Sequence, residues 1–304
     1  MQAEAEELLM DDFRPIELTD KPFFDQFLVR EEPTISELTF TNLFMWRRCR
    51  RTVWRVWNGV LLLILQEPNA EPFGLPPVGD GDKAAALEVL VAELRTLNAM
   101  PRVSRVSGDF VRSFVDPDKY QVLADPNNND YVYLAQDLIE LTGKKFHRKK
   151  NHFNKFIKNY SFEYSELTPE LVGSFLDLQE VWCELKNCTE NEGLLEEHGA
   201  IYEALSNYKT LGFRGGAIII NSRVEAFAIG EMLNRDTAVI HVEKANPDIP
   251  GIYAAINQQF CQAAWSQVKY INREQDLGLD SLKKAKQSYN PDHLVEKFIL
   301  IPKN

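Results

Sequence analysis

The segment from Asp130 to Tyr160 constrains the fold more than any other stretch, because it concentrates positive charge in an acidic chain. No acidic residue lies between Leu141 and Tyr160. The basic residues there are Lys144, Lys145, Arg148, Lys149, Lys150, Lys155 and Lys158. Since the formal net charge is −11, the rest of the chain sums to −18. The segment contains no Pro and its apolar residues recur at helical spacing, which predicts a helix from about Gln136 to Asn159, weakest at Gly143.

Two lysines break the amphipathic pattern of this predicted helix. A rotation of about 100° per residue places Phe153 and Ile157 on one side. The opposite side carries Lys144, Arg148, His152 and Lys155. Lys149 and Lys150 instead fall inside the apolar arc. Either their stems run along the core edge and their amines reach water, or this face borders a cleft for a phosphate, a nucleotide or an acidic headgroup. On the second interpretation, Lys144, Arg148, Lys149, Lys150 and His152 are candidate donor-binding residues.

Three motifs in order resemble a known family. They are DYVYLAQDLIELTGKKFHRKKNHFNKF, YINREQDLG and LKKAKQSYNP. The chain, from about Phe13 to Pro302, is similar to the domain that forms the catalytic C-terminal part of bacterial phosphatidylglycerol lysyltransferases. The resemblance implies an α/β fold of two tandem GNAT-like lobes, each with a mixed, mostly antiparallel sheet flanked by helices. Like the resemblance to Fem-type transferases of the same tandem fold, it also implies an aminoacyl-tRNA donor.

Length and charge restrict the class of protein. With 304 residues, of which 44% are hydrophobic, the chain can bury two domains or one large one. An isoelectric point of about 5.1 argues against general nucleic-acid binding, so a contact with tRNA is expected only at the basic helix. The longest apolar run, Val60–Leu65, is too short to span a membrane, and the acidic N-terminus does not have the pattern of a signal peptide. These features predict a cytoplasmic protein.

The four cysteines predict neither disulfides nor a metal site. Cys49, Cys183, Cys188 and Cys261 occur in different predicted elements without CxxC spacing. Scattered thiols in a chain of this size are typical of a reducing cytosol. None of them has a neighbouring His that would complete a zinc site.

The order of elements suggests one unit that occurs twice. Two strands meet at Asn58-Gly59, a strong hairpin signal, and a second hairpin is expected at Asn221-Ser222. We expect an N-terminal tail over residues 1–12, a first lobe over 13–135, a basic connecting helix over 136–160 and a second lobe over 161–304. In the second lobe the predicted order of strands and helices is similar to that of GNAT acyltransferases.

Candidate acid/base residues lie on two neighbouring strands of the second lobe. The period of two places His241 and Glu243 on one face of TAVIHVEKA, and Glu231 on a face of the preceding strand. These three side chains are therefore expected to converge. A carboxylate or imidazole in a partly desolvated cleft suits removal of a proton from an acceptor amine or hydroxyl. The alternative is a charged outer face of an antiparallel sheet.

A second constellation follows the strand VKYINR. Arg273 ends that strand and Asp276 lies in the turn before the next helix, a favoured ligand position in α/β sheets. Asp276 is a candidate catalytic residue, although the residue type is also typical of turns and N-caps. Arg273 is predicted to bind the donor, with further contacts from Lys284, Lys286 and Tyr289 on the following helix.

The segment that would bind coenzyme A departs from the GNAT pattern. GNAT enzymes hold its pyrophosphate on a glycine-rich loop at a helix N-terminus. Here the segment HVEKANPDIPGIYAAIN has one Gly, two prolines that remove donors, and Asp248, which would repel phosphate. Coenzyme A is therefore not the expected donor, and the resemblance implies aminoacyl-tRNA in its place.

The leading hypothesis is an aminoacyl or acyl transferase whose acceptor is a small molecule or a lipid headgroup. The sequence contains neither a G-x-S-x-G elbow nor a phosphate-binding G-x-x-x-x-G-K-[ST] loop, which disfavours a serine hydrolase and an NTPase. Two alternatives stay open: a catalytically silent module of the same fold that binds a nucleotide or RNA, and a coenzyme-A-dependent N-acetyltransferase.

Overall fold

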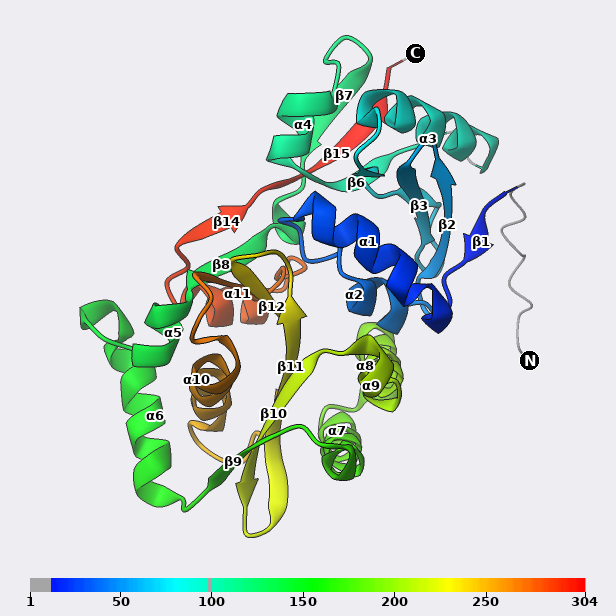
Figure 1. The fold of residues 1–304 in the computed structure, drawn as a ribbon. Helices are drawn as coiled ribbons and strands as arrows, with labels where there is room; N and C mark the ends of the chain where they lie inside the picture. The colour runs from blue at the N-terminus through cyan, green and yellow to red at the C-terminus, as the bar shows by residue number, and fades with distance from the viewer. Residues whose placement is uncertain (1–11, 98–99, 304) are drawn as a thin grey trace.

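Two β-sheets organise the chain in the computed structural model, which describes residues 12–97 and 100–303 (Figure 1). The expected tail over 1–12 lies, except for Asp12, outside these residues. The first sheet runs in the order β1 (Arg14–Pro15), β2 (Arg51–Trp57), β3 (Val60–Gln66), β4 (Phe73–Gly74), β6 (Val103–Ser107), β15 (Lys297–Pro302) and β7 (Tyr120–Ala124), with β5 (Val78–Gly79) paired to β3. The second runs β14 (His293–Val295), β8 (Asp130–Leu134), β13 (Tyr270–Asn272), β12 (Thr237–Ala245), β11 (Arg223–Met232), β10 (Arg214–Ile220) and β9 (Glu163–Glu166).

Both predicted hairpins are confirmed. In β2–β3, Trp57 pairs with Val60 across Asn58 and Gly59, which have φ of 46° and 78°. In β10–β11, Ile220 pairs with Arg223 across Asn221-Ser222, also at positive φ. Positive φ at both central residues matches the twist of the flanking strands, and Asn and Gly adopt it at low cost.

Each sheet contains one parallel pair in an otherwise antiparallel order. The helix α3 (Lys83–Leu97) lies between β4 and β6 in the chain, and α10 (Ile252–Trp265) between β12 and β13. A parallel pair needs such a crossover connection. Each lobe thus has one place, at the end of its parallel strands, where a ligand can approach the sheet.

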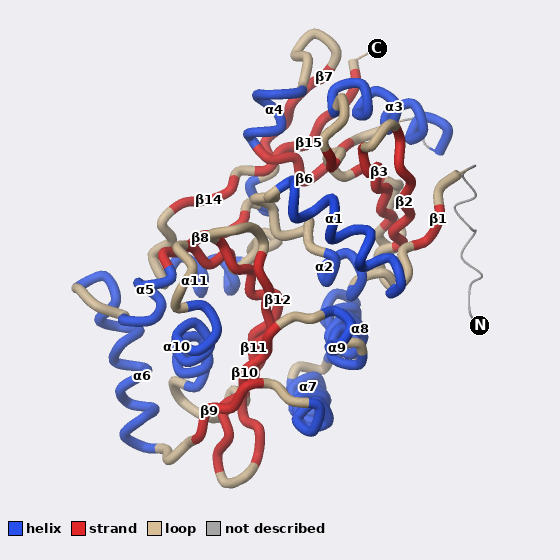
Figure 2. The backbone as a smooth tube through the Cα atoms, in the orientation of Figure 1, coloured by secondary structure: helices blue, strands red, loops and turns tan. Residues whose placement is uncertain are grey.

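Helices cover both faces of the second sheet (Figures 1 and 2). On one face, α10 packs with α5 (Ala135–Glu140) and α6 (His147–Asn159). On the other face lie α7 (Val172–Leu185) and α8 (Glu192–Ser206), followed by the short α9 (Tyr208–Leu211). The core under α7 and α8 continues into the first lobe, to α1 (Lys21–Glu31), α2 (Phe40–Met45) and β3, whereas α3 and α4 (Gly108–Phe114) cover a separate core of the first sheet. The last helix, α11 (Asp280–Gln287), follows β13.

The lobes exchange strands. β8 joins the second sheet although it lies in the range expected for the first lobe (13–135). The C-terminal β15, in the range expected for the second lobe (161–304), returns to lie between β6 and β7 of the first sheet (Figure 1). Nothing local marks such an exchange, because strand pairing depends on residues far apart in the chain.

A buried ionic network holds the point of exchange. Lys297 of β15 places its Nζ 2.6 Å from Glu37 Oε2 and 2.7 Å from Asp130 Oδ1, at the start of β8. The other oxygen of Asp130 accepts from the backbone N–H of Ser36 at 2.8 Å and from Asn272 Nδ2 at 3.0 Å. All five side chains are buried. We call Ser36, Glu37, Asp130, Asn272 and Lys297 the junction network.

The single helix expected over about Gln136–Asn159 is wrong. α5 ends at Glu140 because Leu141 adopts a left-handed φ of 49°, and the backbone turns again at Gly143 before η3 (Lys144–Phe146) and α6. Leu141 is buried, so packing of its side chain offsets the local strain. The break separates the basic α6 from the first part of the segment.

The expectation of four free thiols is also wrong. Cys183 and Cys188 form a disulfide with a Cα–Cα distance of 5.1 Å, at the end of α7. Cys49 and Cys261 are free. Over residues 12–97 and 100–303, no helix has both the length and the apolar content needed to cross a bilayer.

Candidate functional site

The candidate site lies where β12 and β13 stop pairing. Their parallel register ends at Val239 opposite Asn272, while β12 continues to Ala245. Glu243 therefore lies on the part of β12 that has no partner in β13, and Arg273 follows the last residue of β13. The space beyond the carboxyl ends of parallel strands is a favoured ligand position in open α/β sheets.

Arg273 and Glu243 form an ion pair across this gap. Asn257 of α10 donates its Nδ2 to Glu243 Oε1 at 2.8 Å. The guanidinium carbon of Arg273 lies 4.7 Å from the ring centroid of Tyr289 and 5.6 Å from that of Tyr133. Two aromatic rings and one carboxylate thus surround the guanidinium.

Two lysines from segments far apart in the sequence join this pair. Lys149 of α6 places its Nζ 3.8 Å from the ring centroid of Tyr289, and Lys286 of α11 donates to the backbone carbonyl of Arg273. Burial, and next the charge of Arg273, lower the pKa of each amine to about 8. We call Tyr133, Lys149, Glu243, Asn257, Arg273, Lys286 and Tyr289 the Arg273 cluster.

The Arg273 cluster has excess positive charge, since three cationic side chains surround one carboxylate. Two of its buried polar atoms, Arg273 Nη1 and Asn257 Oδ1, have no hydrogen-bond partner within the described part of the chain. An unpaired buried donor is costly, and an anionic ligand would satisfy it. The arrangement therefore favours a carboxylate, a phosphate or a developing oxyanion.

His241 does not belong to this cluster. Its Nε2 lies 2.9 Å from Glu231 Oε1 and its Nδ1 lies 2.8 Å from Glu274 Oε1, which also accepts from Asn42 of α2 at 3.1 Å. Burial opposes the imidazolium, yet the hydrogen bonds and charges of the two carboxylates raise the pKa of His241 to about 9. Despite burial, His241 in turn lowers the pKa of Glu231. With both ring nitrogens engaged, the geometry favours a positioning role over proton transfer.

Of the three side chains expected to converge, Glu231 and His241 do meet, whereas Glu243 lies on the other face of the sheet. The register of β11 and β12 shifts between Ile229 and Gly230, which pair with Val242 and Ile240, so that His241 is a bulged residue. A bulge inserts one residue and reverses the alternation of faces after it. Glu243 therefore points to the face covered by α10, whereas Glu231 and His241 lie toward α2.

The remaining predicted residues lie outside the Arg273 cluster. Asp276 is buried and accepts from Tyr131 Oη at 2.6 Å and from the Gly278 N–H at 2.8 Å, as expected of a turn residue. Lys284 is exposed. On a helix, positions two residues apart point about 200° away from each other, so Lys284 points away from the cluster that Lys286 faces. The other exposed residues are Lys144, Arg148, Lys150 and His152. Of the two lysines in the predicted apolar arc, only Lys149 turns inward.

Sequence reasoning missed Tyr133 and Asn257. Asn257 is a polar residue inside the otherwise apolar start of α10, IYAAIN, and such a residue was a detectable signal. Tyr133 lies within the first family motif but is indistinguishable there from an ordinary strand residue. Among the described residues, no group of three or more His, Cys, Asp or Glu side chains is arranged to hold a metal ion.

The two hydrogen bonds of His241, to Glu231 and Glu274, predict that the free energy of unfolding depends on pH. Because the folded pKa of about 9 lies above the ordinary value of 6.5, this contribution is complete below pH 6.5 and is lost as the pH rises through 9. Between pH 7 and pH 10, the contribution of His241 to the free energy of unfolding, measured with denaturant, should fall by up to about 3 kcal/mol. The variant His241→Gln should lack that component of the loss. An equal pH dependence in both proteins would contradict the assignment.

Comparison with known proteins gives one family match and several similar structures. The family model described as phosphatidylglycerol lysyltransferase, C-terminal, matches residues 30–301. A crystal structure of a conserved protein of unknown function from Bacteroides thetaiotaomicron has a TM-score of 0.90 and 34% identity, covering 96% of this chain and 99% of that one. The structure of L-PGS from Bacillus licheniformis has a TM-score of 0.66 at 11% identity, over 94% and 92% of the two chains.

One curated relative is more distant. An uncharacterised protein of Mycoplasmoides gallisepticum is 21% identical over 184 residues, which is 60% of this chain and 59% of that protein. This chain thus spans about three fifths of the length of that relative. The two mostly antiparallel sheets flanked by helices confirm the expected mixed α/β class, and the similarity to the L-PGS structure supports this fold.

Proposed function

This chain belongs to the phosphatidylglycerol lysyltransferase C-terminal family, and from that premise we propose that it transfers an aminoacyl or other acyl group at the Arg273 cluster. The observation that carries the proposal is the cluster itself, with three cations, one carboxylate and an unpartnered Arg273 Nη1 beyond the ends of two parallel strands. Such donors stabilise negative charge that develops on a carbonyl oxygen during acyl transfer.

In the proposed reaction an amine or hydroxyl acceptor attacks the ester carbonyl of the donor. Arg273 and Lys149 stabilise the oxyanion that forms, and Glu243 is the carboxylate placed to take the acceptor's proton. Breakage of the ester bond releases the donor's hydroxyl, which recovers that proton from Glu243. The acceptor keeps the acyl group, so protons and bonds balance without a further co-reactant.

Aminoacyl-tRNA is the donor that we propose over coenzyme A. In the GNAT pattern the pyrophosphate of coenzyme A lies at the N-terminus of the helix that follows the β12 equivalent, here α10. That helix begins after Gly251, with φ of 88°, and a Cβ there would lie 2.4 Å from the carbonyl oxygen of His152 on α6. Because α6 packs this closely against the start of α10, a pyrophosphate would compete with its backbone for the same space.

A transfer assay tests the proposal. Purified protein is incubated with tRNA charged with a radiolabelled amino acid and with amine, hydroxyl or lipid-headgroup acceptors, and the label on each acceptor is measured. We expect transfer that falls at least about 100-fold in Glu243→Gln, and that falls in Lys286→Gln while Lys284→Gln retains it. The last two residues lie on the same helix, but only Lys286 is in the cluster. Circular dichroism confirms that each variant is folded.

The exposed basic side of α6 favours a second candidate function, a silent module that binds RNA. Arg148, Lys150, Lys155 and Lys158 of α6 and Lys144, just before it, are all exposed, in a chain with a net charge of −11. Salt-sensitive binding of tRNA without label transfer to any acceptor would support this function and contradict the transferase. If acetyl-coenzyme A raises the melting temperature whereas charged tRNA does not bind, the coenzyme-A-dependent alternative is correct.

A further inference from the structure

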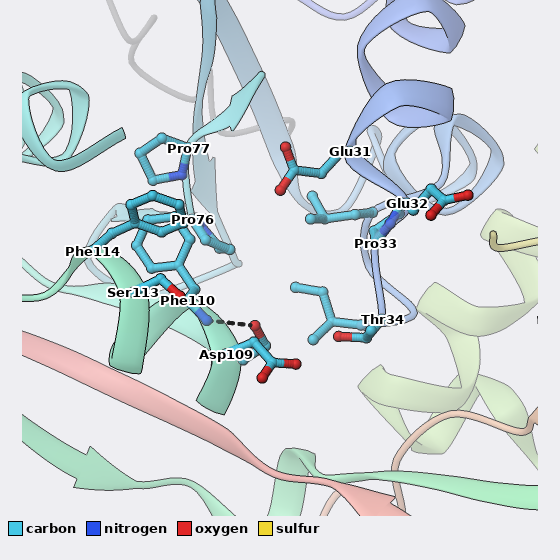
Figure 3. Close-up of a pocket in the computed structure, with 13 residues that line it drawn as sticks. Glu31, Glu32, Pro33, Thr34, Pro76, Pro77, Asp109, Phe110, Ser113 and Phe114 are labelled. Atoms are coloured by element: carbon cyan, nitrogen blue, oxygen red, sulfur yellow. Dashed lines mark hydrogen bonds between the residues drawn. The ribbon is translucent and has the colours of Figure 1, made fainter. Parts of the chain in front are cut away.

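The first lobe has an open cavity at the position that the Arg273 cluster fills in the second lobe. The parallel strands β4 and β6 pair at Gly74 and Val103, and the cavity lies beyond their carboxyl ends. Pro76 and Pro77 follow β4, and Ser107 ends β6 and precedes α4. Figure 3 shows Pro76 and Pro77 facing the segment from Glu31 to Thr34 across the open space. Both lobes thus place a site where their parallel strands end.

We propose that this first-lobe cavity binds a small, uncharged, apolar molecule with an alkyl chain or an aromatic ring. Its lining is mostly apolar and comes from three separate segments. The apolar lining residues are Pro33, Ile35, Leu38, Pro76, Pro77, Phe110 and Phe114. A concave site lined by aromatic and aliphatic side chains with a few polar groups is typical of small-molecule binding.

The charges around the cavity exclude ions of either sign. Three carboxylates line it, and each already has a cationic partner. Glu31 accepts from Lys83 Nζ at 2.6 Å and from the Gly79 N–H at 3.0 Å, and Glu32 lies 2.7 Å from Arg235 Nη2. Asp109 pairs with Arg112. Because each carboxylate is already paired, none offers an uncompensated charge to an ammonium ligand. Among the described residues that line the cavity none is basic, so an anion would find no cationic partner there.

The volume of the cavity limits the ligand to a small molecule. The cavity measures about 180 Å³. One buried water needs only about 10–15 Å³, whereas pockets for drug-sized ligands have about 300–1,000 Å³. The space therefore suits one ring or a short chain.

Hydrogen bonds to the second lobe keep the cavity open. The carbonyl oxygen of Pro33 accepts from Asn234 Nδ2 at 2.9 Å, and that of Thr34 accepts from Asn272 Nδ2 at 3.4 Å. Ser36, two residues after Thr34, belongs to the junction network. Because this wall is tied to β13 and to the β11–β12 turn, it cannot move onto α4 without breaking those bonds. The site is therefore preformed, which lowers the cost of binding.

The test uses the full chain and the uncharged fluorescent probe N-phenyl-1-naphthylamine, which emits strongly in apolar surroundings. We expect saturable binding at one site. 1-Hexanol should displace the probe, whereas hexylammonium and hexanoate at the same concentration should not, because burial of an unpaired charge is costly. Stronger displacement by either ion, or no saturable binding, would overturn the proposal.

A matched pair of variants locates the probe. Ser113 lines the cavity from the exposed side of α4, so Ser113→Trp should fill the space without disturbing the core and weaken binding at least 10-fold. Gln121→Trp adds the same ring at an exposed position on β7 that does not line the cavity, and should bind as the original protein does. Equal affinity in Ser113→Trp and Gln121→Trp, with both folded by circular dichroism, would refute the site. The outcome does not depend on acyl transfer at the Arg273 cluster.

Discussion

Replacing Lys297 by Met is expected to lower the free energy of unfolding by about 3–5 kcal/mol, because it leaves two buried carboxylates without their cation. Lys297 Nζ lies 2.6 Å from Glu37 and 2.7 Å from Asp130, and neither acid is exposed. Met has a similar length and fills the same space, so the loss measures charge rather than volume. Urea unfolding at pH 8 provides the value. Lys303→Met, at an exposed position six residues later, should change stability by less than about 0.5 kcal/mol.

The pH dependence of this variant separates charge from packing. Burial raises the pKa of Glu37, and Lys297 is the main group that lowers it. Without Lys297 the pKa of Glu37 should rise further. A raised carboxyl pKa destabilises the fold above the ordinary pKa of Glu, and the penalty shrinks as the pH falls and the group is protonated. The loss in Lys297→Met should therefore be smaller at pH 5 than at pH 8. A loss independent of pH would indicate a packing defect instead.

Arg273→Lys is expected to lower the rate of the proposed transfer by about 100-fold or more, the typical effect of removing one oxyanion donor. The guanidinium carbon lies 4.7 Å from the ring centroid of Tyr289 and 5.6 Å from that of Tyr133, the side chain pairs with Glu243, and Nη1 is the atom left for a ligand. An ammonium keeps the charge but has neither the plane nor the second donor. The label-transfer assay gives the rate. An unchanged rate in Arg273→Lys would mean that only charge matters at this position.

A second variant at the same residue tests the geometry without any assay of activity. The charge of Arg273 is, after burial, the main cause of the lowered pKa of Lys149. In Arg273→Gln the pKa of Lys149 should therefore rise from about 8 toward its ordinary value. Nuclear magnetic resonance of labelled lysine side chains measures this titration. Lys284→Gln, on the exposed side of α11, should leave it unchanged.

Features set by residues close together in the sequence were predictable, whereas features set by contacts between distant segments were not. The hairpin at Asn58-Gly59 was predictable because two adjacent residues carry its whole signal. Helical spacing also identified Lys149 as anomalous, since a 3.6-residue period needs only near neighbours. The end of α5 at Leu141 was not predictable, because an apolar residue in a left-handed conformation is stabilised by burial that the local sequence does not reveal.

The sequence by itself determined the local elements, the excess of positive charge before Tyr160 and the likeness to one family. The tertiary structure decided which of the candidate residues meet. A bulge at His241 turned Glu243 toward α10, and the return of β15 to the first sheet buried Lys297 between the lobes. Both events depend on pairing between segments far apart in the chain. Periodicity describes the face of a single element, whereas a site requires the relative placement of several, which only long-range packing sets.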